Sequence, residues 1–141
     1  MSDYRSQSWS NGTGRLGGRA ARLRKNVSLD ASQQSTHPYA LIVNLIYHHL
    51  GTDRMPGLHE ELERLDRTEE AVADRIVAAY DAHFAMVVTG DGTRDLFLYL
   101  PHNISEAEIE QHIEAPEPEV DYDFSIQHDP AWQPYHELMP T

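Results

Sequence analysis

The sequence has no cysteine among its 141 residues. This absence excludes a disulfide framework, a thiolate metal centre and a cysteine nucleophile, and it favours a reducing compartment. The sequence also lacks an apolar run near the roughly 18 residues that a membrane helix needs. No apolar signal segment is visible at its start. We therefore expect a cytoplasmic protein that makes no membrane contact.

Basic residues are scarce and unevenly placed in this chain, whose formal net charge is −12. Residues 1–30 hold six of the eleven basic side chains and only two acids, whereas residues 31–141 hold five arginines and 21 acids. Such an acidic body repels nucleic acid, whose binding is mostly electrostatic. The basic segment can either contact a phosphate backbone or fold against its own body. We expect the second.

Residues 82–100 carry the clearest hairpin pattern. Residues 83–89 and 95–100 are rich in Val, Phe, Leu and Tyr, which suit strands. Between them, Gly90-Asp91-Gly92-Thr93 offers glycines for the positive φ angles of a tight turn.

The other elements follow from spacing and capping signals. Residues 39–48 are apolar on both faces and predict a central strand, whereas residues 120–127 alternate as in an outer strand. Apolar spacing predicts a helix over residues 58–80. Ser105 and Glu108 form a capping box for a second, short helix that ends near residue 115. Residues 28–38 are expected to form a loop.

This order predicts one α+β fold, a ferredoxin-like βαββαβ sandwich with an antiparallel sheet of order 4-1-3-2. The strand at residues 83–89 is then an edge strand. Residues 37–141 form the ferredoxin-like domain, and a C-terminal turn lays Trp132 and Tyr135 on it. Residues 1–36 form a basic, Gly-rich N-terminal extension, either a flexible tail or an edge hairpin. The sheet face with Ala40, Ile42 and Ile46 needs a cover, either this extension or another subunit.

Three short motifs resemble one family, the domain of unknown function 695. They are the helix LHEELERLDRTEEAV, the strand-turn-strand VVTGDGTRDLFLYL, and a closing pattern of five residues. That pattern consists of Asp129, Pro130, Trp132, Tyr135 and Pro140. The resemblance implies a fold similar to the regulator of RNase E activity B. It implies no catalytic residues and no cofactor.

Nine histidines invite a metal hypothesis. In the predicted sheet His37, His102 and His128 lie at one end of three adjacent strands, where imidazoles could approach a shared ion. Against this, strand ends are solvated and often carry histidine. We therefore expect neither a metal nor a cofactor, and whether the protein is an enzyme stays open.

The expected function is a small non-enzymatic binding or regulatory module that acts through protein contacts, with a partner or by self-association. An acidic body suits a basic partner surface. The candidate binding residues are Trp9, Arg19, Arg22, Arg24, Trp132 and Tyr135. Two alternatives stay open: a metal-dependent enzyme that uses the strand-end histidines, and nucleic-acid contact through the basic N-terminal segment, which the net charge disfavours.

Overall fold

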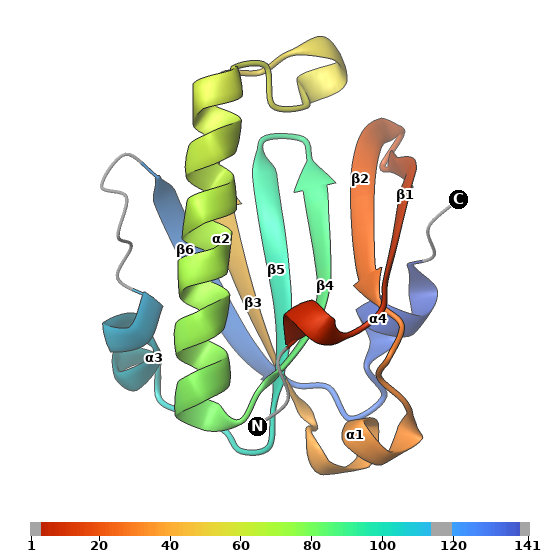
Figure 1. The fold of residues 1–141 in the computed structure, drawn as a ribbon, viewed down its shortest axis with the longest axis vertical. Coiled ribbons are helices and arrows are strands. Elements are labelled where there is room, and N and C mark those ends of the chain that lie inside the picture. Colours follow the sequence, from red (N-terminus) through yellow and green to blue (C-terminus); the bar gives the residue numbers. More distant parts are fainter. Residues whose placement is uncertain (1–3, 114–119, 139–141) are drawn as a thin grey trace.

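The computed structural model describes residues 4–113 and 120–138. These residues form one antiparallel sheet with helices packed on it (Figure 1). The elements in chain order are η1 (Tyr4–Ser6), β1 (Trp9–Leu16), β2 (Arg19–Asn26), α1 (Ala31–Thr36), β3 (Tyr39–Ile46), η2 (Thr52–Arg54), α2 (His59–Tyr80), β4 (His83–Gly90), β5 (Thr93–Leu100), α3 (Glu106–Ile113), β6 (Asp121–His128) and α4 (Gln133–Glu137). The predicted end of the second helix near residue 115 and the motif residue Pro140 lie outside the described residues.

The sheet has six strands in the order β1-β2-β4-β5-β3-β6, and all its pairings are antiparallel. The α+β class is therefore confirmed, but the predicted four-stranded sheet of order 4-1-3-2 is not the sheet observed. The prediction that residues 83–89 form an edge strand is also wrong, because β2 pairs with β4 from Arg22↔Thr89 to Lys25↔Met86. Strands β1 and β2 extend the sheet as an edge hairpin, which is one of the two alternatives that the sequence left open for residues 1–36.

One face of the sheet packs against α2 and α3 (Figure 1). The core here combines Leu41, Val43 and Leu45 of β3 with Leu96, Leu98 and Leu100 of β5, all of them fully buried or nearly so. Helix α2 contributes Leu65, Val72 and Ile76, a spacing that keeps these side chains on one stripe. Each such buried side chain contributes about 1.5–3 kcal/mol relative to an exposed one.

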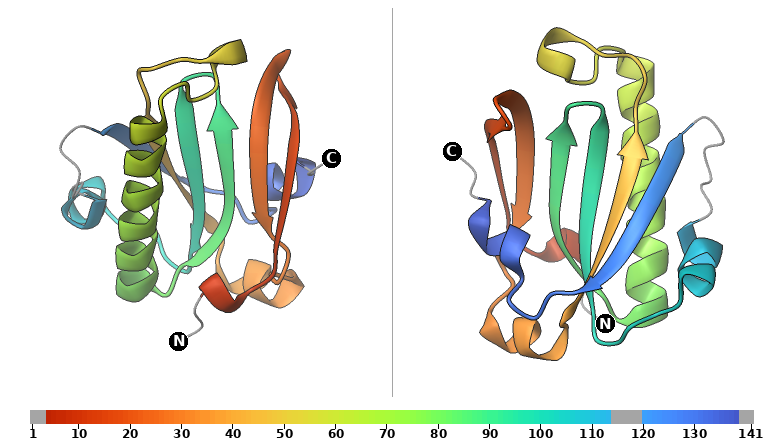
Figure 2. Two further views of the ribbon diagram at one scale, coloured as in Figure 1. Left: turned by 45° about the horizontal axis from the view of Figure 1, so that its top comes forward. Right: turned by 180° about the vertical axis from the view of Figure 1, so that it is seen from behind.

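The opposite face is covered near one end by the C-terminal segment (Figure 2, right). Trp132 is 1% exposed and stacks on Tyr99 with ring centroids 4.1 Å apart. Ile42 packs against the same cluster, and Ala40 belongs to it. The sequence led us to expect the N-terminal extension or a second subunit over Ala40 and Ile42. The buried cluster on this face does contain residues of the extension, and the C-terminal aromatic residues join them there; its members include Ala21, Leu23, Leu29, Trp132 and Tyr135.

The β4–β5 hairpin has a two-residue turn at Asp91-Gly92, whose φ angles are 50° and 93°. An Asp-Gly pair with positive φ at both residues is the preferred hairpin turn. Gly90 has another reason to be glycine, since a Cβ there would lie 2.7 Å from the carbonyl oxygen of Ala20 in β2. Gly92 thus serves the turn as predicted, whereas Gly90 permits the close approach of β2.

The N-terminal segment forms a β-hairpin and packs against the rest of the chain. Strands β1 and β2 pair along their whole lengths, from Trp9↔Asn26 to Leu16↔Arg19. Arg5 pairs with Glu70 at 2.9 Å and Asp74 at 2.7 Å on α2, so this basic segment does fold against the acidic body. The predicted loop at residues 28–38 contains α1, which Asp30 caps together with Gln33. That D-x-x-Q capping box is readable in the sequence.

Among the described residues, no helix is both long enough and apolar enough to cross a membrane.

Candidate functional site

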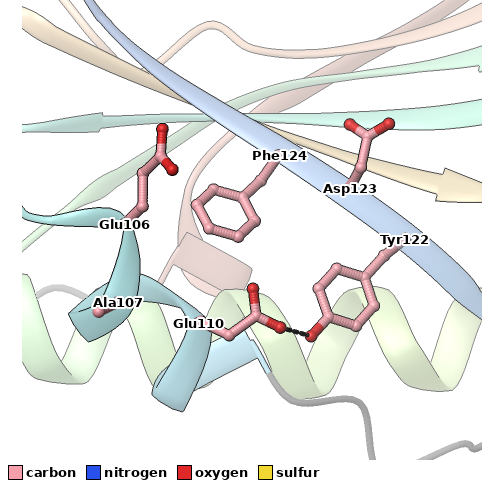
Figure 3. Close-up of a pocket in the computed structure, with 6 residues that line it drawn as sticks. All are labelled: Glu106, Ala107, Glu110, Tyr122, Asp123 and Phe124. Carbon is pink, nitrogen blue, oxygen red and sulfur yellow. Dashed lines mark hydrogen bonds between the residues drawn. The ribbon is translucent and has the colours of Figure 1, made fainter.

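A surface pocket of about 620 Å³ lies between α3 and the edge strand β6 (Figure 3). Its lining residues are Glu106, Ala107, Glu110, Tyr122, Asp123 and Phe124. Half of these residues carry a carboxylate and two carry an aromatic ring, whereas none is basic. The pocket therefore combines negative charge with apolar surface at one place.

Helix α3 is held so that its acids face this pocket. The Ser105 hydroxyl accepts a hydrogen bond from the backbone N–H of Glu108 at 3.3 Å, which starts the helix. Ile109 and Ile113 are completely buried in the core that contains α2. Because residues 106 and 110 are one turn apart and off the buried stripe, both glutamates remain exposed.

Strand β6 supplies the aromatic part of the pocket through its alternation. Tyr122 and Phe124 are half-buried and pack against the core on the helix side of the strand. The Tyr122 hydroxyl donates a hydrogen bond to the Glu110 carboxylate, which ties the strand to α3. Asp123 leaves the strand on the side opposite to the two rings (Figure 3). Carboxylates therefore lie on both sides of the two rings: those of Glu106 and Glu110 on α3, and that of Asp123 on β6.

The outer edge of β6 is open in the described part of the chain. Strand β6 pairs with β3 along its whole length, from Tyr39↔His128 to Ile46↔Asp121. It is the last strand in the sheet order, so no other described strand pairs with its second edge. An edge strand presents backbone N–H and C=O groups that another extended chain can pair with.

The aromatic binding candidates from the sequence all have packing partners. Trp9 is half-buried against Phe84, with ring centroids 5.3 Å apart, and its Nε1 donates to the Tyr4 carbonyl at 3.0 Å. Trp132 and Tyr135 are 1% and 5% exposed. A partner could contact Trp132 or Tyr135 only after the C-terminal segment moved. Their role in binding stays a prediction.

The three arginine candidates lie on β2, near the edge of the sheet that is opposite to β6. Arg19 is exposed, and its Nε is 3.4 Å from the Asp91 carboxylate. Arg24 pairs with the Glu69 carboxylate of α2. Arg22 has no hydrogen bond or ion pair with any residue that the structure describes. Arg22 and Arg24 line the same cavity, and Arg19 lines another.

The three histidines of the metal hypothesis do not converge. His37 is buried, with Nε2 2.8 Å from the Asp81 carbonyl oxygen and Nδ1 2.7 Å from the Thr36 hydroxyl. His128 lies against the Tyr39 ring, whereas His102 is exposed. In residues 4–113 and 120–138, no three His, Asp or Glu side chains are arranged so that they could hold a metal ion. The His37 ring contacts the ring of His83, and the two ring centroids are 4.0 Å apart.

The sequence interpretation missed most of the pocket residues, although a signal for them exists. The residues not identified as binding candidates include Glu106, Glu110, Tyr122, Asp123 and Phe124. The two glutamates are one helical turn apart on an exposed face, and the two rings alternate with acids on a strand. Their meeting depends on the crossover from α3 to β6, which spacing alone does not fix.

The fold and the pocket define a small α+β protein with a six-stranded antiparallel sheet and an acidic groove at its open edge. The chain belongs to the family of unknown function DUF695, which it matches over residues 7–139. This match confirms the family resemblance. No curated protein and no solved structure matches the chain, so the similarity to the regulator of RNase E activity B is not confirmed.

Proposed function

We propose that this protein is a non-enzymatic binding module that engages a basic, extended segment of a partner protein at the α3–β6 pocket. The observation that carries the proposal is the meeting of three carboxylates and two aromatic rings beside an open strand edge. An extended segment can add to the edge of a sheet through its backbone and place alternate side chains in neighbouring pockets.

Charge favours a basic occupant. Glu106, Glu110 and Asp123 would attract lysine or arginine side chains, and the rings of Tyr122 and Phe124 can pack along their aliphatic stems or face a guanidinium. The acidic body adds a long-range attraction that speeds association with a basic partner. A second copy of this chain is a poorer occupant of the same edge, because two β6 strands would bring acids against acids.

The test is a capture experiment in a lysate of the native cell, followed by quantitative mass spectrometry. The baits are the unmodified protein, the double variant Glu106→Gln/Glu110→Gln and the matched control Glu60→Gln/Glu63→Gln. The control also removes two negative charges, but from the exposed start of α2. We expect a partner that the unmodified protein and the control retain and that the pocket variant loses.

The outcome decides the site as well as the function. If the pocket variant retains the same proteins as the other two baits, the α3–β6 pocket is not the binding surface. A partner without a basic segment would also contradict the proposal. Self-association is measured separately by sedimentation of the purified protein, where we expect a monomer.

We further propose that the part of the chain from β3 to β6 is a ferredoxin-like unit to which β1 and β2 are added. Its support is the run β4-β5-β3-β6 within the sheet and the packing of α2 and α3 into one core. The alternatives of a metal-dependent enzyme and of nucleic-acid contact stay predictions. For nucleic acid, two of the basic N-terminal side chains, Arg5 and Arg24, are already paired with acids of α2.

A further inference from the structure

A second cavity, of about 440 Å³, lies between α2 and the strands toward the β1–β2 edge of the sheet. Helix α2 lies over the strands on one side of the sheet, while β1 and β2 extend beyond it (Figure 1). The residues that line this cavity are Asn11, Arg22, Arg24, Leu62, Asp66, Val87, Thr89 and Arg94. They come from β1, β2, α2, β4 and β5, and three of them are arginines.

The strand register brings the arginines together. Arg22 lies directly opposite Thr89, and Thr89 lies directly opposite Arg94. Residues directly opposite each other point to the same face of a sheet, so these three side chains form one row across β2, β4 and β5. Arg24 is two residues from Arg22 on β2 and therefore extends from the same face. Three guanidinium groups thus border one cavity.

The buried member of this row has an unused donor. Arg94 has only 8% of its side chain exposed. Its Nε donates to the Thr89 hydroxyl at 3.0 Å, and its Nη1 donates to Asp66 at 2.6 Å and to Glu69 at 3.2 Å. Its Nη2 has no hydrogen bond with any residue in the described ranges. Nη2 is not one of the fully buried side-chain atoms that lack a hydrogen-bond partner, so it is accessible to solvent and can donate to a ligand in the cavity.

The charges at the cavity do not balance. Arg24 shares the Glu69 carboxylate with Arg94, and Asp66 pairs with Arg94 alone. Arg22 has no counter-charge among the described residues. Three guanidinium groups therefore face two carboxylates, which leaves one positive charge in excess. In a chain with net charge −12, an excess of this sign in one concave place is unexpected from composition.

We propose that this arginine cavity binds the oxyanion group, phosphate or carboxylate, of a small molecule. Arg22 and the free Nη2 of Arg94 would donate to the oxyanion from two sides of Thr89. Guanidinium groups suit such ligands, because their planar donors match the oxygen atoms of phosphate and carboxylate. Asn11 adds a neutral amide to the lining, and Leu62 and Val87 add apolar surface for the rest of the molecule.

The experiment is isothermal titration calorimetry of the purified full chain with three probes: inorganic phosphate, phenyl phosphate and citrate. Low ionic strength is used because salt screens such interactions. We expect saturable binding of at least one probe. Tighter binding of phenyl phosphate than of inorganic phosphate would indicate a phosphate ester, whereas preference for citrate would indicate a carboxylate ligand. Absence of saturable binding with all three overturns the proposal.

Variants of exposed arginines locate the binding. Arg22→Ala should weaken binding about tenfold or more, the loss expected from one charge-assisted contact. The matched control Arg15→Ala also removes one arginine from the N-terminal hairpin. The Arg15 side chain is 69% exposed and lies 3.6 Å from the Asp53 carboxylate. Its loss should therefore change the affinity for the probe by no more than about twofold. Equal affinities for Arg22→Ala and the unmodified protein would overturn the site. Neither side chain is buried, so both variants should fold, which circular dichroism checks.

Discussion

Substitution of Trp132 tests whether the C-terminal segment is a structural part of the core. Its indole is 1% exposed and stacks on Tyr99, and its Nε1 donates a hydrogen bond to the His37 carbonyl at 2.7 Å. This bond joins two segments that are 95 residues apart in the chain. We therefore expect Trp132→Ala and Trp132→Phe to destabilise the protein by different amounts.

The two variants separate packing from hydrogen bonding. Trp132→Ala removes the ring and leaves a cavity, which costs about 3–5 kcal/mol for large aromatic residues. Trp132→Phe keeps most of the ring surface but leaves the His37 carbonyl without its donor, at a cost of about 1–3 kcal/mol. Because natural domains have about 5–15 kcal/mol of stability, the alanine variant should lose a large part of it.

The assay is urea unfolding followed by circular dichroism at neutral pH, with Trp9→Phe as the control. Trp9 is half-buried, so the loss of its bond to the Tyr4 carbonyl should cost only about 1 kcal/mol. An unchanged midpoint for Trp132→Ala would refute the packing role. It would instead support a Trp132 that is free to contact a partner.

Two further predictions concern titratable groups. Burial raises the pKa of Asp95, a half-buried carboxylate that accepts a hydrogen bond from Asn44 at 2.7 Å. A raised pKa in the folded state means that ionisation of this carboxyl group opposes folding. Asp95→Asn should therefore raise the urea midpoint at pH 7, and this gain should disappear below about pH 4. A lower midpoint for the variant at pH 7 would contradict the predicted direction of the stability change. Burial, and then the neighbouring His37, lower the pKa of His83 below its ordinary 6.5, although Asp81 opposes this shift. The unfolded chain then binds the proton more readily than the folded protein, so this contribution to stability should be complete above pH 6.5 and should fall as the pH drops below it. His83→Gln should reduce that fall, as measured by unfolding curves between pH 7.5 and 5.5. An unchanged pH dependence in the variant would assign the fall to other groups.

Local periodicity predicted the elements whose environment repeats along the chain. The apolar stripe over residues 58–80 corresponds to α2 (His59–Tyr80), because the spacing of Leu65, Val72 and Ile76 directly reflects one buried helix face. Strand β6 (Asp121–His128) shows the same relation at period two. For these elements the side chains that pack are close together in the sequence, so the pattern is sufficient.

The elements with weak local patterns depend on partners far away in the chain. Strand β1 contains Gly12 and Gly14 and shows no clear alternation, and it becomes a strand because β2 pairs with it and is itself fixed to β4. The sequence did predict that a C-terminal turn lays Trp132 and Tyr135 on the domain, but not that they share one buried cluster with Ala40, which depends on the direction of the chain after β6. Long-range pairing of this kind outweighs local propensity.

The candidate sites were hidden for the same reason. Arg22 and Arg94 are 72 positions apart in the sequence, and only the pairing of β2 with β4 and of β4 with β5 places them around Thr89. The sequence did single out Arg22 and Arg24 as basic residues of one segment. It offered no reason to associate them with Arg94, which reads as one arginine of a strand.

The acidic pocket and the arginine cavity should act independently, because the sheet keeps them apart. Arg94 on β5 lies two inter-strand spacings of about 4.8 Å from β6, which is about 10 Å, but Arg22 on β2 lies four spacings from β6, which is about 19 Å. The distance to Arg22 is about twice the screening length of about 8 Å in physiological salt, so charges of the acidic pocket are weakly felt at Arg22. The variant Glu106→Gln/Glu110→Gln should therefore lose the partner protein but bind phosphate or citrate like the unmodified protein, and Arg22→Ala should show the reverse. Loss of both activities in either variant would mean that the two surfaces belong to one coupled site.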